Sequence, residues 1–250
     1  MNKNKTAAQL HHIDKYRNTF FIDKYVALWA YGYLNNFGQS EGLYRTVNEL
    51  GFSQLDQTGK YQILDVGCGV GRTAADYAVF FKNSEVVGID DAESMIDMAN
   101  KINKTDEKIQ IDLSNIGFET FKINCRQIDN LCFKKAKLLE FYSQSIKNSF
   151  DIVTAVNFID RVADIKQSFE LIYDLLKFGG IFIFATPLNF SNSEDWKLFG
   201  SFEKLLKLVQ SIGFKVEVSF DGLIYKEVLD ARGATEEYLT CVMRLVKHNK

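Results

Sequence analysis

The sequence of 250 residues predicts an α/β fold in which a doubly wound sheet of seven strands carries helices on both faces. From residue 61 onwards, short apolar runs alternate with longer amphipathic runs. A glycine-rich turn follows the first apolar run, and acidic residues follow the second. The expected strands are 61–66, 85–90, 121–126, 150–156, 180–186, 215–220 and 238–246. The expected helices are 72–81, 92–103, 134–147, 165–178 and 201–212.

Capping residues mark the ends of the later helices. Asp164 is an expected N-cap, and Gln167 is its partner in a capping box. Gly179 and Gly180 end one helix before a strand, and Gly213 ends the next. A loop, rather than a clear helix, separates the last two strands. We therefore expect the last strand to run antiparallel to its neighbours.

Residues 1–50 are expected to form an N-terminal helical cap, and residues 51–250 the main domain. The segment 8–50 is rich in aromatic residues. They are Tyr16, Phe20, Phe21, Tyr25, Trp29, Tyr31, Tyr33, Phe37 and Tyr44. Most of these rings should pack on the core, and a few should line a substrate pocket, because pockets are mostly apolar. Residues 104–120 are an expected insertion before the third strand.

Composition excludes several classes of protein. A formal net charge of −2 argues against a nucleic-acid-binding protein, which usually carries a basic excess. The four cysteines form no C-x-x-C pair and only three histidines are present, so no metal site is expected. Reduced cysteines predict a cytoplasmic protein. Neither a signal peptide nor a long uncharged apolar run is visible, so we expect no membrane association. The oligomeric state is left open.

The turn after the first strand is the most informative motif. Asp65 precedes three glycines at alternate positions, Gly67, Gly69 and Gly71. Glycine permits a sharp turn and the close approach of a ligand to the backbone. Asp90 ends the second strand, 19 positions after the last of these glycines. An acid at that place grips a ribose hydroxyl in nucleotide-binding βαβ units.

The residue pattern of this turn distinguishes between two cofactors. The dinucleotide fingerprint requires a glycine where this chain has Arg72, and Asp65 would repel a pyrophosphate. The order Asp-x-Gly-x-Gly-x-Gly resembles motif I of the class I methyltransferases, which use S-adenosylmethionine (SAM). The resemblance covers about residues 60–246 and implies a Rossmann-like fold with SAM as cofactor. A tight turn without a ligand is the alternative, which the spacing of Asp90 disfavours.

The resemblance implies a role for each motif residue. The loop from Gly67 through Cys68 to Gly69 should pass close to the methionine part of SAM, above Asp65. Asp90, with Asp91 beside it, should bind the ribose.

Two further positions are assigned to the adenine. Met95 resembles the family position that packs on the ring, although it is equally a core methionine of an amphipathic helix. Gln127 and Asp129 follow the expected third strand, where an acid could accept the adenine amino group. A solvated loop acid is the alternative.

The end of the fourth strand lies beside the switch point of a doubly wound sheet, where ligands bind. We expect Asn157 near the transferred methyl group. Asp160 and Arg161 are expected to hold an ammonium and a carboxylate of the substrate; an ion pair that starts the next helix is the alternative. The candidate general bases are Asp160, Tyr33, His11 and His12, of which the histidines are more simply solvated.

A finer resemblance concerns the acceptor. The stretch from Asn157 to Arg161, followed by Asp164, Gly179-Gly180, Thr186-Pro187 and Trp196, is similar to the methyltransferase module of ovothiol synthases. The stretch 126–129 also fits that module. The module methylates an imidazole nitrogen of a mercaptohistidine, which implies a small histidine-like or amino-acid-like acceptor. The ending 230–238 departs from the module and leaves the acceptor open. The alternatives are a non-catalytic SAM-binding protein and a nicotinamide-dependent oxidoreductase.

Overall fold

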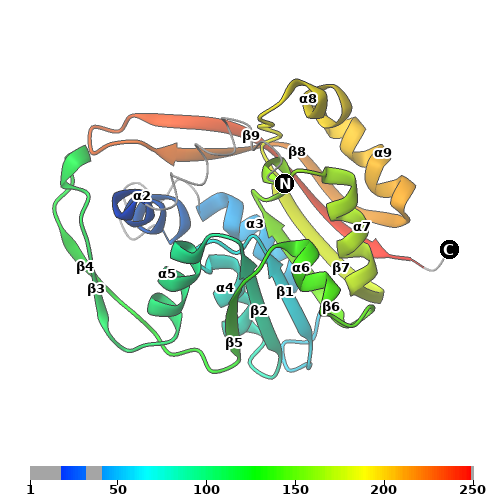
Figure 1. The fold of residues 1–250 in the computed structure, drawn as a ribbon, viewed down its shortest axis with the longest axis horizontal. Helices are drawn as coiled ribbons and strands as arrows, with labels where there is room; N and C mark the ends of the chain where they lie inside the picture. Colours follow the sequence, from blue (N-terminus) through cyan, green and yellow to red (C-terminus); the bar gives the residue numbers. More distant parts are fainter. Residues whose placement is uncertain (1–17, 32–40, 249–250) are drawn as a thin grey trace, which may run out of the picture.

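The computed structural model describes residues 18–31 and 41–248. Its main sheet has seven strands in the order β5-β2-β1-β6-β7-β9-β8 (Figure 1). They are β1 (Gln62–Val66), β2 (Glu85–Asp90), β5 (Leu131–Lys135), β6 (Phe150–Val156), β7 (Leu176–Thr186), β8 (Phe214–Val228) and β9 (Thr235–Lys247). The first five strands of this order are parallel, and β9 runs antiparallel to both β7 and β8. The predicted fold class, with an antiparallel last strand, is confirmed.

Helices cover both faces of the sheet. They are α3 (Glu41–Phe52), α4 (Arg72–Phe80), α5 (Glu93–Asn103), α6 (Leu138–Ser143), α7 (Ile165–Leu175), α8 (Ser193–Phe199) and α9 (Phe202–Ile212). One buried cluster joins the sheet to α6, α7 and α9, and a second joins it to α3, α4 and α5. Ile165, Phe169 and Ile172 show why α7 packs where it does, because their i, i+4, i+7 spacing forms one buried apolar face. The Asp164 side chain accepts a hydrogen bond from the Gln167 amide, as a cap should.

The strand predicted at 121–126 is present, but its predicted place as the third strand of the main sheet is wrong. Residues Phe121–Asn124 form β4, which pairs antiparallel with β3 (Lys108–Ile111) in a separate two-stranded sheet. The third parallel strand is β5, which pairs with β2. Both β4 and β5 alternate buried and exposed residues, so the period alone does not separate them. The helix expected from residue 134 consequently begins only at Leu138.

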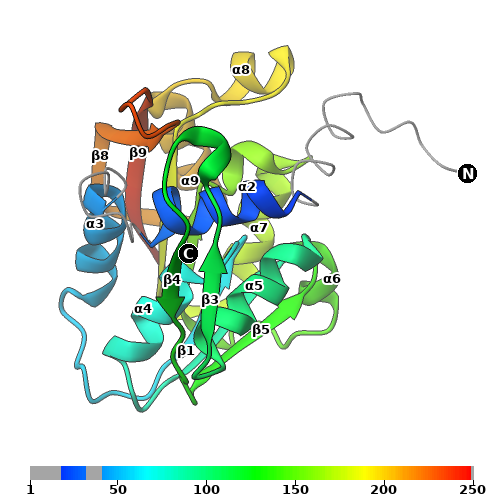
Figure 2. The same ribbon diagram turned by 90° about the vertical axis from the view of Figure 1, so that its left-hand side faces the viewer.

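The N-terminal segment packs between two hairpins at the carboxyl ends of the parallel strands. It consists of α2 (Thr19–Lys24) and the π-helix η1 (Tyr25–Ala30). In Figures 1 and 2 the β3–β4 hairpin lies on one side of α2 and the long β8–β9 hairpin on the other. The Trp29 indole donates to the Val228 carbonyl at 3.0 Å, and the Asp112 amide donates to Asp23 at 3.1 Å. A third buried cluster therefore unites this segment with α5 and both hairpins.

The boundary expected at residue 50 stays a prediction. The helix α3 crosses that position, since it runs from Glu41 to Phe52. In the described part of the chain, every helix is too short or too polar to cross a membrane.

Candidate functional site

The turn after β1 needs its glycines for two reasons. Gly67, Gly69 and Gly71 all have positive φ, at 67°, 52° and 83°. A Cβ at Gly67 would lie 2.5 Å from the Phe158 ring, and one at Gly71 would lie 2.4 Å from the Phe133 ring. A Cβ at Gly69 would lie 3.3 Å from the Tyr25 hydroxyl, on the side of the N-terminal segment. The loop is therefore held in a conformation that only glycine adopts at low cost.

Asp65 lies under this loop and is 2% exposed. Its carboxylate accepts hydrogen bonds from the Thr154 hydroxyl at 2.7 Å and from the Ala74 amide at 3.1 Å. Burial raises the pKa of Asp65 to about 7, against the opposing effect of these two donors. The residue thus ties β1 to β6 and to the first turn of α4, in addition to lining the cavity described below.

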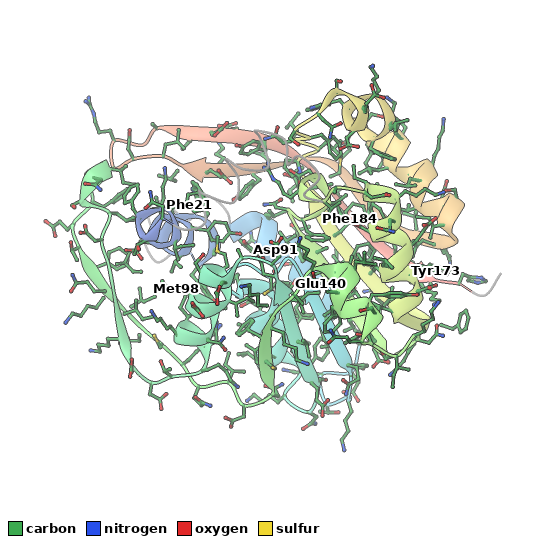
Figure 3. All side chains as sticks on the ribbon, in the orientation of Figure 1. Phe21, Asp91, Met98, Glu140, Tyr173 and Phe184 are labelled. Atoms are coloured by element: carbon green, nitrogen blue, oxygen red, sulfur yellow. The ribbon has the colours of Figure 1, made fainter. Side chains whose placement is uncertain are left out.

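Asp90 orders the glycine loop from the neighbouring strand. One oxygen accepts the Gly69 amide at 3.0 Å, and the other accepts the Ala92 amide at 2.9 Å. Burial raises the pKa of Asp90 to about 6. Each carboxylate oxygen retains a second lone pair, which suits the ribose hydroxyls of SAM. The adjacent Asp91 is exposed and lies where β2 passes into α5, near the centre of the molecule in Figure 3.

A small cavity of about 10 Å³ separates the glycine loop from the N-terminal segment. It is lined by Tyr25, Ala30, Tyr44, Asp65, Gly67, Cys68, Val70, Arg72, Thr73 and Val156. Next to Val156, the side-chain oxygen of Asn157 is buried without a hydrogen-bond partner. An orphaned acceptor beside a glycine cradle fits a ligand that donates hydrogen bonds, as the ammonium of SAM does. Gly67 and Cys68 therefore line this cavity, and Asn157 directly follows Val156, which lines it as well.

The predicted adenine-binding residues do not all gather there. Gln127 and Asp129 precede β5 instead of following it, so the reasoning that placed them at the carboxyl edge is wrong. Both are exposed, and the Gln127 amide donates to Asp129 at 3.3 Å. Ala136 and Lys137 follow the strand, and the Ala136 amide donates to the Asp90 carbonyl.

Met95 is a core residue in this structure. It is 2% exposed and belongs to the buried cluster between α5 and the N-terminal segment. Phe21 and Met98 pack at the same cluster, and Figure 3 shows both on the left of the molecule. Met95 therefore packs as the core methionine that was the alternative interpretation. A contact between Met95 and adenine stays a prediction.

The loop after β6 carries Asp160 and Arg161, the two charged residues predicted to hold the substrate. Asp160 is 5% exposed; its carboxylate accepts the Thr186 hydroxyl at 3.4 Å and lies 3.3 Å from Arg161 Nε. The second contact is an ion pair without hydrogen-bond alignment, because that carboxylate oxygen has no hydrogen-bond partner. Burial raises the pKa of Asp160 to about 6, and Arg161 opposes the rise. The predicted bases Tyr33, His11 and His12 lie outside the described residues.

Sequence reasoning missed Arg72 as a site residue, and it did not single out Tyr31 or Tyr44 from the aromatic residues of which a few were expected to line a pocket. The Arg72 guanidinium binds Asp76 at 2.7 Å and donates to the Ala30 carbonyl at 3.1 Å. It also lies over the rings of Tyr44 and Tyr31, at 5.2 and 5.8 Å from their centroids. These contacts fasten the N-terminal segment to the glycine loop. The aromatic richness of that segment was the available signal, but it did not say which rings face the loop.

The strand order, the glycine loop after β1 and the acid after β2 together define a SAM-dependent methyltransferase of the Rossmann-like class. The chain belongs to the methyltransferase domain family, whose model matches residues 57–211. A protein of Geobacillus sp. (strain WCH70), named as a candidate methyltransferase, is 27% identical over 135 residues. The match covers 52% of this chain and 44% of that protein, so this chain matches less than half the length of its curated relative.

Solved structures share the fold. A candidate SAM-dependent methyltransferase from Listeria monocytogenes has a TM-score of 0.56 at 13% identity, covering 83% of this chain and 99% of that one. A candidate methyltransferase from Bacillus halodurans C-125 also has a TM-score of 0.56 at 13% identity, covering 82% of this chain and 100% of that one. The cyclase SpnF has a TM-score of 0.56 at 15% identity, covering 86% of this chain and 84% of that one. At these identities the likeness shows the fold alone.

Proposed function

We propose that this methyltransferase transfers a methyl group to an imidazole or amine nitrogen of a small histidine-like or amino-acid-like acceptor. The observation that carries the proposal is the loop after β6. It places the orphaned oxygen of Asn157, the buried Asp160 and the half-exposed Arg161 within five residues, at the end of a central parallel strand. The ovothiol synthase resemblance of the same stretch supports a nitrogen acceptor and stays a prediction.

SAM supplies the electrophilic methyl group when bound. The residues of this chain orient the reactants and exclude water from between them. Alignment alone accounts for roughly 7–11 kcal/mol of a reaction barrier. The Asn157 oxygen is available to accept a hydrogen bond from the cofactor or the acceptor, and the Arg161 fork suits a carboxylate.

Asp160 is the described residue best suited to hold a proton taken from the acceptor. Its pKa of about 6 is near neutrality, where a general base contributes about 10²–10⁴-fold to a rate. A neutral imidazole requires no strong base, because its lone pair is already free. A modest rate loss in Asp160→Asn would therefore indicate an imidazole acceptor, and a large loss an ammonium that must first be deprotonated.

The first experiment tests the cofactor site by calorimetry with S-adenosylhomocysteine. Gly69→Val should weaken binding by at least about tenfold, equivalent to about 1.4 kcal/mol, because φ is positive and the new side chain would approach Tyr25. The matched control is Gly42→Val, where an added Cβ meets nothing within 4 Å. Equal affinity of Gly69→Val and the wild type for S-adenosylhomocysteine would show that the loop is not part of the cofactor site.

The second experiment tests the acceptor with labelled SAM. Histidine, its derivatives and other amino acids are offered to the wild-type protein, and transfer to nitrogen is measured. Labelling of RNA or protein, with none of these small molecules labelled, would contradict the proposed acceptor. Binding of SAM without transfer to any class of acceptor would instead favour the non-catalytic SAM-binding alternative.

A further inference from the structure

We propose that one face of the β8–β9 hairpin recognises a cationic group on the methyl acceptor, through the carboxylate of Glu227 and the rings of Tyr225 and Tyr238. This inference rests on the proposed function, because it assigns recognition of the acceptor's positive charge to one side of the same site. Cations bind over aromatic rings, and a neighbouring carboxylate adds an attraction of the same sign.

The pairing register of β8 and β9 brings these three side chains together. Tyr225 and Glu227 lie two positions apart on β8 and so share one face of the hairpin. Tyr238 pairs with Tyr225, and their rings stack with centroids 6.0 Å apart at 25°. The Tyr225 hydroxyl donates to the Glu227 carboxylate at 3.0 Å. Tyr225 itself is 3% exposed, so its ring is fixed in place.

This face is turned towards the cofactor loop. Besides burial and Glu227, the phenols of Tyr44 and Tyr25 raise the pKa of Tyr225. The elements that carry these two tyrosines, α3 and η1, both pack against β8. Tyr44 and Tyr25 both line the cavity beside the glycine loop. The indole bond from Trp29 to the β8 backbone holds the N-terminal segment and the hairpin together, and Figure 2 shows the hairpin beside α2.

The charge on this face favours a cation. Glu227 pairs directly with Glu236, and like charges opposite one another destabilise a hairpin. A cation bound beside both carboxylates is attracted by the two negative charges. After burial, the same two carboxylates raise the pKa of Tyr238, whereas Arg161 lowers it. The opposite, anionic end of the same acceptor would then be held by Arg161, on the loop after β6.

A buried hydroxyl supplies an independent sign of a ligand. Thr240 is completely buried, and its hydroxyl has no hydrogen-bond partner. It lies two positions beyond Tyr238 on β9, on the same face of the hairpin. An orphaned polar group of this kind is uncommon in a finished core. It is explained if an acceptor with a hydrogen-bonding group enters beside it.

The test measures binding of tetramethylammonium to the full chain by calorimetry, since this cation does not depend on knowing the acceptor. Wild-type protein should bind it saturably, and should bind neutral tert-butanol at least about tenfold more weakly. Glu227→Gln should weaken tetramethylammonium binding by about tenfold, which corresponds to about 1.4 kcal/mol. The matched control is Glu237→Gln, since Glu237 lies on the opposite face of the hairpin and pairs there with Lys226. That control should bind like the wild type.

A second pair of variants separates the ring from the hydroxyl. Tyr238→Phe should keep the affinity for tetramethylammonium, and Tyr238→Leu should lower it several-fold, with circular dichroism confirming that both fold. No saturable binding by the wild type, or equal losses in Glu227→Gln and Glu237→Gln, would overturn the inference. Cation binding without methylation of any amine or imidazole would leave this face standing and refute the proposed acceptor. Methylation of an amine, together with unchanged tetramethylammonium binding in Glu227→Gln, would support the proposed acceptor and refute this face as its cation site.

Discussion

Asp65→Asn should make the free energy of unfolding less dependent on pH. Asp65 is buried beneath the glycine loop, where its pKa is about 7. An amide has nearly the same shape and cannot ionise. Its oxygen can accept the Ala74 amide, and its NH₂ group can donate to the Thr154 hydroxyl, which accepts as well as donates. The substitution should therefore keep the local geometry while removing the titration.

The magnitude follows from the difference between folded and unfolded pKa values. The ordinary pKa of the group is 3.8, and burial raises it to about 7 in the folded protein. The folded state thus holds a proton that the unfolded state has already lost. The stability from this proton is fully present below pH 3.8 and is lost as the pH rises through about 7. Between about pH 5 and pH 8 the loss is about 2–3 kcal/mol.

Urea denaturation of both proteins across this range is the appropriate assay. Asp90 and Asp160 also have raised pKa values, so the wild type alone does not isolate Asp65. The difference between wild type and variant does, because the other two groups titrate in both proteins. The variant should gain about 2–3 kcal/mol relative to the wild type as the pH rises from about 5 to about 8. A difference that stays constant across this range would refute the protonation of Asp65 in the folded state.

Two further predictions concern neighbouring parts of the site. Gly71→Ala should destabilise the protein by about 1–3 kcal/mol, because φ is 83° and the new Cβ would lie 2.4 Å from Phe133; an unchanged urea midpoint would show that Phe133 moves aside freely. Arg161→Lys should raise KM for a carboxylate-bearing acceptor by at least about fivefold while S-adenosylhomocysteine affinity stays within about twofold, because lysine cannot form the bidentate fork. Equal KM values in steady-state kinetics would exclude Arg161 from the acceptor site.

The central strands of the sheet could be predicted because they are buried on both faces. Mostly apolar runs such as Gln62–Val66 and Phe150–Val156 are distinctive, and the glycine loop fixes where the first of them ends. The third strand could not be predicted in the same way. Phe121–Asn124 and Leu131–Lys135 have the same alternating pattern, and only pairing with β2 decides between them. Gln127 and Asp129 were assigned to the wrong end of a strand for that reason.

The candidate site was predictable where it depends on local spacing. Gly67 and Gly69 come together with Asp90 because a βαβ unit brings its strand ends together. The face of the β8–β9 hairpin that carries the paired tyrosines was not predictable, because it depends on the register of two long antiparallel strands. Tyr225 and Tyr238 become neighbours only when that register is set.

The bond between Trp29 and Val228 has a consequence for the order in which the protein is made. The two residues are 199 positions apart in the chain, so the N-terminal segment waits for its partner until nearly all of the sequence has left the ribosome. At about 5–20 residues per second this interval lasts roughly 10–40 seconds. During that time the apolar side chains of α2 and η1 lack the β8–β9 hairpin, which covers one side of them. Their burial is therefore among the last steps of biogenesis, and a nascent chain interrupted before β8 exposes them to chaperones.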